Sequence, residues 1–403
     1  YGPITCSGTL GFLGLSLARE AGVESEAVEK SYKAQRAFFG HYAPRSGMGY
    51  GEMPYGLSVG GDYNGKCSMS GLALALEEEQ EDKAKFFARV AMLSTYGIRQ
   101  YAHGGSYFGQ VFHPIGAALG GPSAANLKFR EIRWHMDLKR RWDYRWIYDS
   151  SGNGYGDFEH AAAALLFYAA PLKQLVITGR DRKASLELTD AEFEEIVGVK
   201  NFDGAKATNA ELIAALPTVQ GFMRAPAAEE LARRLKESPE APESSEIIDA
   251  LLAMAGDAQT GIFGRTGACF ALMKIKDRSR EPLASLKNAE ITEGMVQLLD
   301  AADPYLRFAG VRLLQRLDPA TVRPHADAIM DAIVATGRPT FPLDEEDPLQ
   351  WAHGEMGSLL ADTALKDGLD GVDQSKLIPA LRSLLETPNG GARAVSSKLL
   401  TKL

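Results

Sequence analysis

Three segments in the first half of the chain gather the residue types that bind polar ligands or transfer protons. They are 43–66, 97–106 and 142–157, and each leads into a run of small apolar residues. Aromatic rings stack on the apolar faces of a ligand while polar groups fix its orientation. The aromatic and polar residues of these three segments therefore predict a site for a sugar or a peptide. The candidate ligand-binding residues are Tyr50, Glu52, Asn64, Lys66, His103, Tyr107, His113, Trp142, Trp146 and His160.

Two carboxylates in these segments are candidates for a general acid and base, namely Glu52 and Asp157. Asp157 also stands where a helix N-cap is expected, and capping is the preferred interpretation because aspartate favours that position. His103 lies in a glycine-rich loop that brings the backbone close to a ligand, which makes it a candidate proton shuttle. A hydrolase or lyase would use Glu52 with His103 or Asp157, and a lyase would add a cation such as Lys66 or Arg99. The alternative for these two cations is ion pairing with Asp62 or Glu52. The sequence leaves open whether the protein is an enzyme.

Other site chemistries are not expected. The histidines show neither HxH nor HExxH spacing, so no metal site is predicted. Neither GxGxxG after a strand nor GxxxxGK[ST] occurs, so no nucleotide and no cofactor is expected. Cys67 lies near a helix start, but no histidine can be assigned as its partner, and it is interpreted as a small buried thiol.

Composition limits the classes of partner. A net charge of −8 over 403 residues argues against nucleic acid, which needs clustered lysine and arginine. No run of 18 apolar residues exists, so no membrane span is predicted. Three widely spaced cysteines make no disulfide framework. No secretion signal is recognised in a sequence that starts at Tyr1, and the compartment is not decided.

The tryptophans of the first half divide by context. Trp134 lies in an amphipathic helical pattern and is interpreted as a core residue, whereas Trp142 and Trp146 lie in a loop and are candidates for a stacking platform. The basic run 139–141 is interpreted as a helix C-terminus favoured by the helix dipole rather than as a nucleic-acid patch.

The chain divides into a nearly neutral first part and an acidic remainder. Residues 1–180 hold 19 Lys and Arg against 17 Asp and Glu, while the whole chain holds 44 against 52. The first part thus has a net charge of +2 and the remainder −10. We predict a helical domain at 1–180, a helical connector and linker at 181–245, and helical repeats at 246–403.

Two helix starts and a linker are expected between the two parts. Thr189 and Thr208 are each followed three residues later by a glutamate, which is the spacing of a capping box. The stretch 237–245 contains two prolines and ends with two serines, a composition typical of a linker.

The pattern of residues 1–180 predicts helical hairpins. Small, apolar helices without a polar face are expected to be buried, and longer amphipathic helices to cover them with a solvated charged face. Inner helices that alternate with outer ones predict an all-α fold, a partial α/α toroid. The inner helices' N-termini would meet on one face and favour an anion or a polar ligand there. The expected inner helices are Leu10–Ala21, Met69–Leu76, Tyr107–Leu119 and Phe158–Ala170, and the outer ones are Ser25–Tyr42, Glu81–Tyr96 and Ser123–Arg141.

The second part repeats with a period near that of HEAT motifs. Arg265, Arg307, Trp351 and Arg393 are separated by 42, 44 and 42 residues. Two helices per repeat would bury their apolar stripes only against their neighbours, which predicts a HEAT-like α-solenoid. Its expected role is to bind a protein partner or to support the first domain.

Several motifs of residues 1–180 resemble a bacterial family of unknown function. Its members carry an N-terminal PDZ domain and a helical domain related to terpenoid-cyclase and six-hairpin toroids, with HEAT repeats in some. The resemblance implies this fold and an exported or periplasmic location in the cell envelope, but no activity. Four hairpins are fewer than a six-hairpin ring needs, and the PDZ region has no counterpart here. The motifs are Tyr50-Gly-Glu52, Asn64-Gly-Lys66, His103-Gly-Gly-Ser-Tyr-Phe108, Gly120-Gly-Pro122, Arg130-Glu-Ile-Arg-Trp134, Asp137-Leu-Lys-Arg-Arg-Trp142-Asp143, Pro171-Leu172 and Ile177-Thr178-Gly179.

Three functions remain open at this point. The first is a glycan- or peptide-binding toroid on a HEAT-like scaffold. The second is a carbohydrate-active hydrolase or lyase. The third is a purely structural scaffold for protein–protein interaction.

Overall fold

A computed structural model of the chain divides it into two compact units, Tyr1–Phe202 and Asp203–Leu403. The structure describes residues 5–45, 47–49, 62, 65–94, 107–148, 158–159, 161–174, 176–178, 186–218, 223–276, 286–336, 351–387 and 390–401.

The predicted all-α class is confirmed, because helices supply nearly all the regular structure of the described residues. The exception is one short antiparallel pair, β1 (Ile147–Tyr148) with β2 (Phe158–Glu159). The helix predicted from Phe158 begins instead at Ala161. Phe158 and its neighbour pair with β1, and aromatic residues suit such a pleated pair.

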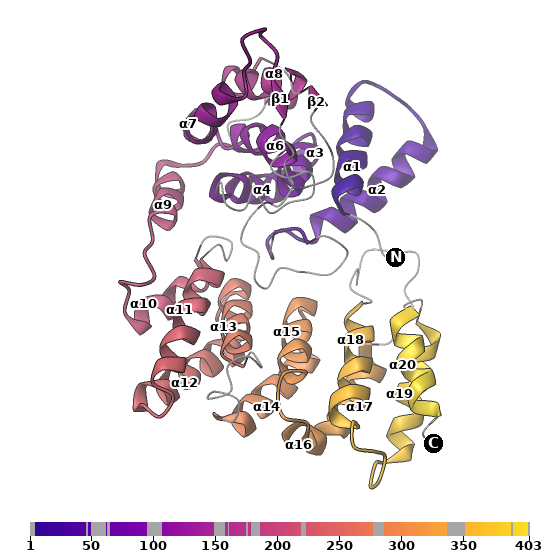
Figure 1. Cartoon of the computed structure of the whole chain (residues 1–403). Coiled ribbons are helices and arrows are strands. Elements are labelled where there is room, and N and C mark those ends of the chain that lie inside the picture. Colours follow the sequence, from indigo (N-terminus) through magenta and orange to yellow (C-terminus); the bar gives the residue numbers. More distant parts are fainter. Residues whose placement is uncertain are drawn as a thin grey trace. The chain divides into compact units, whose positions relative to one another are not determined.

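Helical hairpins build the described part of the N-terminal unit (Figure 1). The two helices of each hairpin contact each other: α1 with α2, α3 with α4, and α6 with α7. First helices of successive hairpins also pack together, α1 against α3, α3 against α6, and α6 against α8. Hairpins placed along an arc would make these contacts, and a toroid remains a prediction. The elements are α1 (Thr5–Glu20), α2 (Glu26–Gly40), α3 (Lys66–Leu74), η3 (Glu78–Gln80), α4 (Glu81–Leu93), α6 (Tyr107–Ala118), α7 (Pro122–Leu138), α8 (Ala161–Ala169), η4 (Ala170–Leu172), η5 (Val176–Thr178) and α9 (Asp190–Lys200).

The inner helices differ in how far they are buried. Every residue of α3 is buried. Where α3 meets α6, a Cβ on Gly116 would lie 2.9 Å from the Cα of Ser68, so glycine is required for the close approach. By contrast, α8 leaves Ala162 and Leu165 exposed, so full burial holds for α3 and not for α8.

The C-terminal unit stacks its helices in two layers (Figure 1). In one layer α11, α13, α15, α18 and α20 each contact the next. In the other, α12 contacts α14 and α17 contacts α19. Repeat proteins bury apolar stripes by such stacking, and assignment to the HEAT class remains a prediction. The elements are α10 (Asn209–Ala215), α11 (Arg224–Glu237), α12 (Pro242–Gly256), α13 (Ile262–Ile275), α14 (Asn288–Gln297), η9 (Leu298–Asp300), α15 (Pro304–Leu314), α16 (Pro319–Val322), η10 (Arg323–His325), α17 (Ala326–Thr336), α18 (Trp351–Leu359), η11 (Leu360–Ala364), α19 (Gln374–Glu386) and α20 (Gly390–Leu400).

The predicted helix starts at Thr189 and Thr208 are confirmed. Each threonine side chain accepts a hydrogen bond from the backbone N–H of the glutamate three residues later. The side chain of that glutamate accepts a hydrogen bond from the backbone N–H of the threonine. The predicted linker 237–245 is shorter than expected, because α12 already begins at Pro242. Proline suits the first helical turn, where its missing N–H leaves no bond unmade.

The recurring arginines of the second part hold helix ends. Arg265 Nε donates to the carbonyl of Ala255 near the end of α12, at 2.9 Å. Carbonyls at a helix C-terminus have no intrahelical partner and favour a positive charge, so the guanidinium stabilises them. The side chain of Trp351 lies outside the described residues. The same contact is made at 3.2 Å from Arg307 to Ala301 and at 2.7 Å from Arg393 to Thr387.

We expect Arg265→Met to lower the free energy of unfolding of the C-terminal unit by about 1–2 kcal/mol, the cost of a lost hydrogen bond with its carbonyl left unsatisfied. Urea unfolding followed by circular dichroism measures it. Arg382→Met is the control, since Arg382 is exposed on α19. Equal losses in the two variants would contradict the capping role.

Candidate functional site

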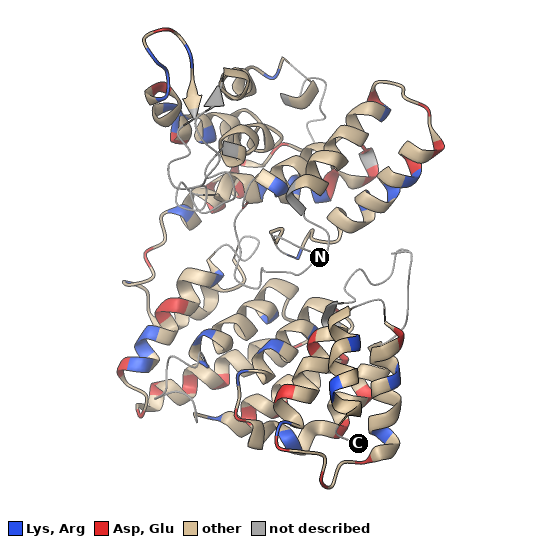
Figure 2. Cartoon of the chain, turned by 45° about the vertical axis from the view of Figure 1, so that its right-hand side comes forward, with Lys and Arg blue, Asp and Glu red and all other residues tan. Residues whose placement is uncertain are grey.

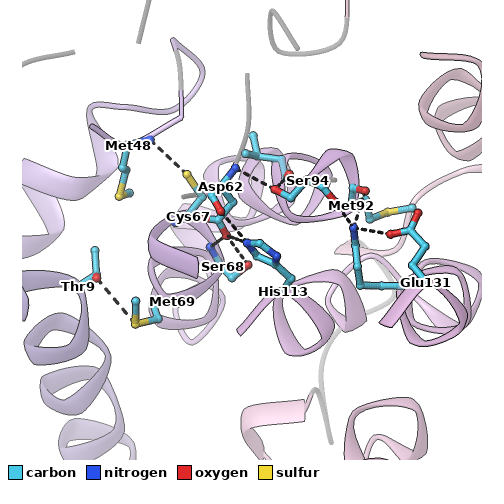
Figure 3. A network of polar contacts seen from close by, with 12 residues as sticks. Thr9, Met48, Asp62, Cys67, Ser68, Met69, Met92, Ser94, His113 and Glu131 are labelled. Carbon is cyan, nitrogen blue, oxygen red and sulfur yellow. Dashed lines mark hydrogen bonds and ion pairs between the residues drawn. The ribbon is translucent and has the colours of Figure 1, made fainter. Parts of the chain in front are cut away.

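A buried carboxylate closes the amino end of α3 (Figure 3). Asp62 is fully buried, and its Oδ1 accepts from the Cys67 N–H at 2.8 Å. Its Oδ2 accepts from the N–H and the hydroxyl of Ser68, at 2.9 and 2.6 Å. Gly65 holds the N-cap position with a φ of 67° and has no side-chain acceptor, so Asp62 supplies it from three residues earlier. The anion expected at a helix N-terminus is here part of the protein.

The same aspartate ties α3 to two other segments. Its N–H donates to Ser94 Oγ at 2.8 Å, directly after α4. His113 on α6 is fully buried, and its Nε2 lies 2.7 Å from the Asp62 carbonyl and 3.5 Å from Oδ2. The segment before α3 and the residue directly after α4 therefore meet beside α6, while the predicted convergence with loops 97–106 and 142–157 concerns residues that lie largely outside the described ones.

Lys66 and Cys67, at the start of α3, bind the backbone of residues 48 and 49. Lys66 is buried, and its Nζ donates to the Gly49 carbonyl at 2.5 Å. The Met48 N–H lies 3.3 Å from Cys67 Sγ. Burial raises the pKa of the Cys67 thiol well above its ordinary value, and the Asp62 carboxylate adds to that rise. Burial also raises the pKa of Asp62, against the opposing hydrogen bonds from Ser68 and Cys67 and the Lys66 charge.

Two lysines hold the carboxyl end of α4, at the same end of the α3–α4 hairpin as Asp62. Lys128 Nζ donates to the carbonyls of Met92 and Ser94, at 2.9 and 2.7 Å, where α4 ends. Lys200 Nζ donates to the same Met92 carbonyl at 2.9 Å, and both ammonium groups pair with Glu131. Burial acts to raise the pKa of Glu131, but the two lysines hold this pKa below its usual value. Lys128 lies on α7, which the sequence predicted to be solvated, yet it is fully buried because it caps α4.

A second feature is the Trp142 hairpin, residues 139–148, which follows α7. The Arg141 N–H donates to the Arg145 carbonyl at 2.8 Å, and the Tyr144 N–H to the Arg141 carbonyl at 3.0 Å. Tyr144 has a φ of 67°, in the left-handed region that few side chains adopt. These bonds hold Trp142 outward at the turn, where 91% of it is exposed.

The aromatic residues around this hairpin divide into exposed and packed ones. Tyr144 is 73% exposed, and Trp134, which the sequence analysis assigned to the core, is 51% exposed. Trp134 lies on the outward face of α7, and its indole N–H donates to the carbonyl of Glu131 one turn earlier. Trp146 instead packs against the small core formed by α7 and α8. Of the two predicted stacking residues, Trp142 therefore faces solvent and Trp146 supports the hairpin.

Placement of the predicted site residues is uneven. Lys66 and His113 are buried and hold chain segments, so their geometry gives them a positioning role. Tyr107 begins α6, but its side chain lies outside the described part. The predicted acid–base pairings cannot be placed, because Glu52, His103 and Asp157 are not among the described residues. The predicted residues outside the description are Tyr50, Glu52, Asn64, His103, Asp157 and His160.

Sequence reasoning overlooked several residues of these two features. Ser94 and Lys128 gave no local signal, because their partners lie on other elements. Asp62 was considered only as an ion-pair partner, although a carboxylate shortly before a helix start is also a candidate cap. Arg140 was read only as part of a basic helix end, although aromatic residues follow it at 142, 144 and 146.

The described residues offer neither a metal site nor a membrane-spanning helix. Within the ranges that the structure covers, no three His, Cys, Asp or Glu side chains gather as metal ligands would. No helix in this part of the chain is both long and apolar enough to cross a membrane.

Comparison with known proteins bears on the N-terminal region. Residues 1–179 match the family described as a domain of unknown function (DUF6288). The match covers less than half of the chain, and it supports the predicted resemblance to a family without known activity. The PDZ association of that family, its toroid and the HEAT repeats stay predictions.

The other comparisons add little. None of the curated proteins compared with the chain matches it. A crystal structure of an engineered protein from the Northeast Structural Genomics Consortium aligns over 98% of each chain at 13% identity, with a TM-score of 0.24. A score this low carries no argument about the fold of the DUF6288 region or of the repeats.

We expect Asp62→Asn to destabilise the N-terminal unit by about 2–4 kcal/mol, because the amide offers one oxygen to three buried donors. Urea unfolding of the full chain, followed by near-ultraviolet circular dichroism, measures the loss. The control Asp82→Asn changes an exposed residue in the first turn of α4 and should cost less than about 1 kcal/mol. Similar costs for both variants would refute the capping role of Asp62.

The buried thiols should resist labelling. Burial raises the pKa of Cys269 to about 12, and that of Cys67 is also raised. In a Cys6→Ser variant, a thiol reagent such as DTNB at about pH 8 should react only after denaturation, since the thiolate is the nucleophile. Rapid labelling of Cys67 in the folded chain would contradict its burial beside Asp62.

Proposed function

We propose that the N-terminal unit is a carbohydrate-binding domain whose ligand stacks on the Trp142 hairpin. The observation that carries the proposal is the exposure of Trp142 on a hydrogen-bonded turn beside Tyr144. Exposed large apolar residues that cluster on a soluble protein mark interaction surfaces. An indole held in place offers a flat apolar face to the C–H face of a sugar ring at little entropic cost.

The surroundings of the hairpin support this role. Leu138 at the end of α7 is 76% exposed, one helical turn after Trp134, and adds apolar surface next to the hairpin. Trp146 and Tyr168 anchor the base of the hairpin to the core of α7 and α8. The exposed rings thus stand on a packed support, and binding need not order the surface first. A peptide ligand is the alternative outcome of the test below.

For the C-terminal unit we propose a HEAT-like scaffold that binds a protein partner. Support comes from the layered contacts of α11, α13, α15, α18 and α20, and from the arginine that holds the preceding helix end in three of the repeats. Stacked repeats of this kind present an extended surface to partners.

We expect Trp142→Ala to weaken polysaccharide binding by about tenfold or more, as loss of a central aromatic contact does. The full chain is tested by affinity electrophoresis on neutral glucans, polygalacturonate and chondroitin sulfate, with a peptide array in parallel. Leu165→Ala, an exposed apolar residue on α8, is the matched control and should leave binding unchanged. Binding of peptides alone, or binding unaffected by Trp142→Ala, would overturn the proposal.

A further inference from the structure

We infer that the polysaccharide bound at the Trp142 hairpin is anionic, and that Arg140 and Arg141 bind its carboxylate or sulfate groups. The inference rests on the proposed function, because it names the ligand class for the same surface. Residues 128–145, the second half of α7 and most of the hairpin, hold seven Lys and Arg against three Asp and Glu. Figure 2 colours the chain by charge.

The arginines of the hairpin and of the last two turns of α7 fall into two groups. Arg133 pairs with an aspartate one turn along α7 at 3.3 Å, and Arg145 pairs with the aspartate two residues before it at 2.6 Å. Arg140 and Arg141 have no carboxylate within ion-pair distance among the residues that the structure describes. Both are exposed. Two guanidinium groups beside Trp142 thus carry positive charge that no described side chain neutralises.

Arg140 is also held in place by its neighbours. Its Cζ lies 5.1 Å from the ring centre of Tyr144 and 5.5 Å from that of Trp146. Guanidinium groups stack on aromatic faces and offer paired N–H donors that match a carboxylate or a sulfate. A guanidinium that contacts two rings has less freedom to lose when it binds an anion, and its charge favours an anionic ligand over a neutral one.

The residues at the turn favour a polysaccharide over other anionic partners. A uronic acid residue combines a carboxylate with an apolar C–H ring face, which matches an indole beside a guanidinium. An acidic peptide carries its charge and its apolar surface on separate, flexible side chains, and ordering them costs binding energy.

The test compares ligands that differ only in charge. Binding of the full chain to polygalacturonate is measured against carboxyl-reduced polygalacturonate, with chondroitin sulfate as the sulfated arm. We expect Arg140→Gln/Arg141→Gln to weaken binding to the acidic polymer by about tenfold or more, and salt at about 0.5 M to weaken wild-type binding similarly. Arg382→Gln/Lys366→Gln removes the same charge from exposed positions of the C-terminal unit and should change little.

Each outcome decides between the two proposals. Loss of binding on carboxyl reduction and in the double variant supports the inference, and the sulfated arm tells whether uronate or sulfate is preferred. Equal binding of the reduced polymer, still dependent on Trp142, overturns the inference but leaves the carbohydrate-binding function intact. Absence of polysaccharide binding overturns both. Arginine-dependent binding to phosphatidylserine vesicles without polysaccharide binding would assign the surface to a membrane and reject the inference.

The single variant Arg141→Gln distinguishes a loss of binding from a loss of folding. Arg141 makes only backbone contacts among the described interactions, so the variant should fold as the wild type and still bind polygalacturonate less tightly. Arg140→Lys keeps the charge but not the planar group, and should recover part of the binding that Arg140→Gln loses. Full binding by Arg141→Gln together with no recovery by Arg140→Lys would mean that Arg140 only supports the hairpin.

Discussion

The carboxylate of Asp62 lies against the amino end of α3, where backbone N–H groups have no helical carbonyl to reach. Burying a charge is costly unless hydrogen bonds replace the lost water, and here three donors from Cys67 and Ser68 do so. Because α3 packs against α1, α4 and α6, its position sets that of the other hairpins. The core of the N-terminal unit therefore depends on one acidic side chain that lies outside every helix.

The start of α3 and the end of α4, which meet at one end of the hairpin, are each matched by a side chain of opposite charge. Asp62 faces the positive end of α3, and Lys128 and Lys200 face the negative end of α4. Ser94 joins the two arrangements, since its hydroxyl accepts from Asp62 and its carbonyl accepts from Lys128. These polar groups serve the framework, so the exposed chemistry of the described surface lies elsewhere, on the hairpin after α7.

The sequence predicted the features that local patterns encode. Helix class, the hairpin order and the capping boxes at Thr189 and Thr208 follow from periodicity and from residues three apart. What escaped prediction depends on distant partners: Lys128 is buried because it meets the end of α4, and Trp134 is exposed because α7 turns that face outward. Exposure of Trp142 was weighed but not decided, since only the turn's hydrogen bonds fix it. A short strand pair at Phe158 replaced the expected helix start because its partner lies ten residues earlier.

The arginines near the starts of α13, α15 and α20 have a consequence for how such an array can evolve. Each tie joins a helix to the one directly before it, over six to ten residues of sequence. A helix pair can therefore be gained or lost as a unit without cutting the ties of its neighbours. Contacts between successive pairs, such as the one from Arg316 to the Met273 carbonyl at 2.7 Å, would have to form anew at each new junction.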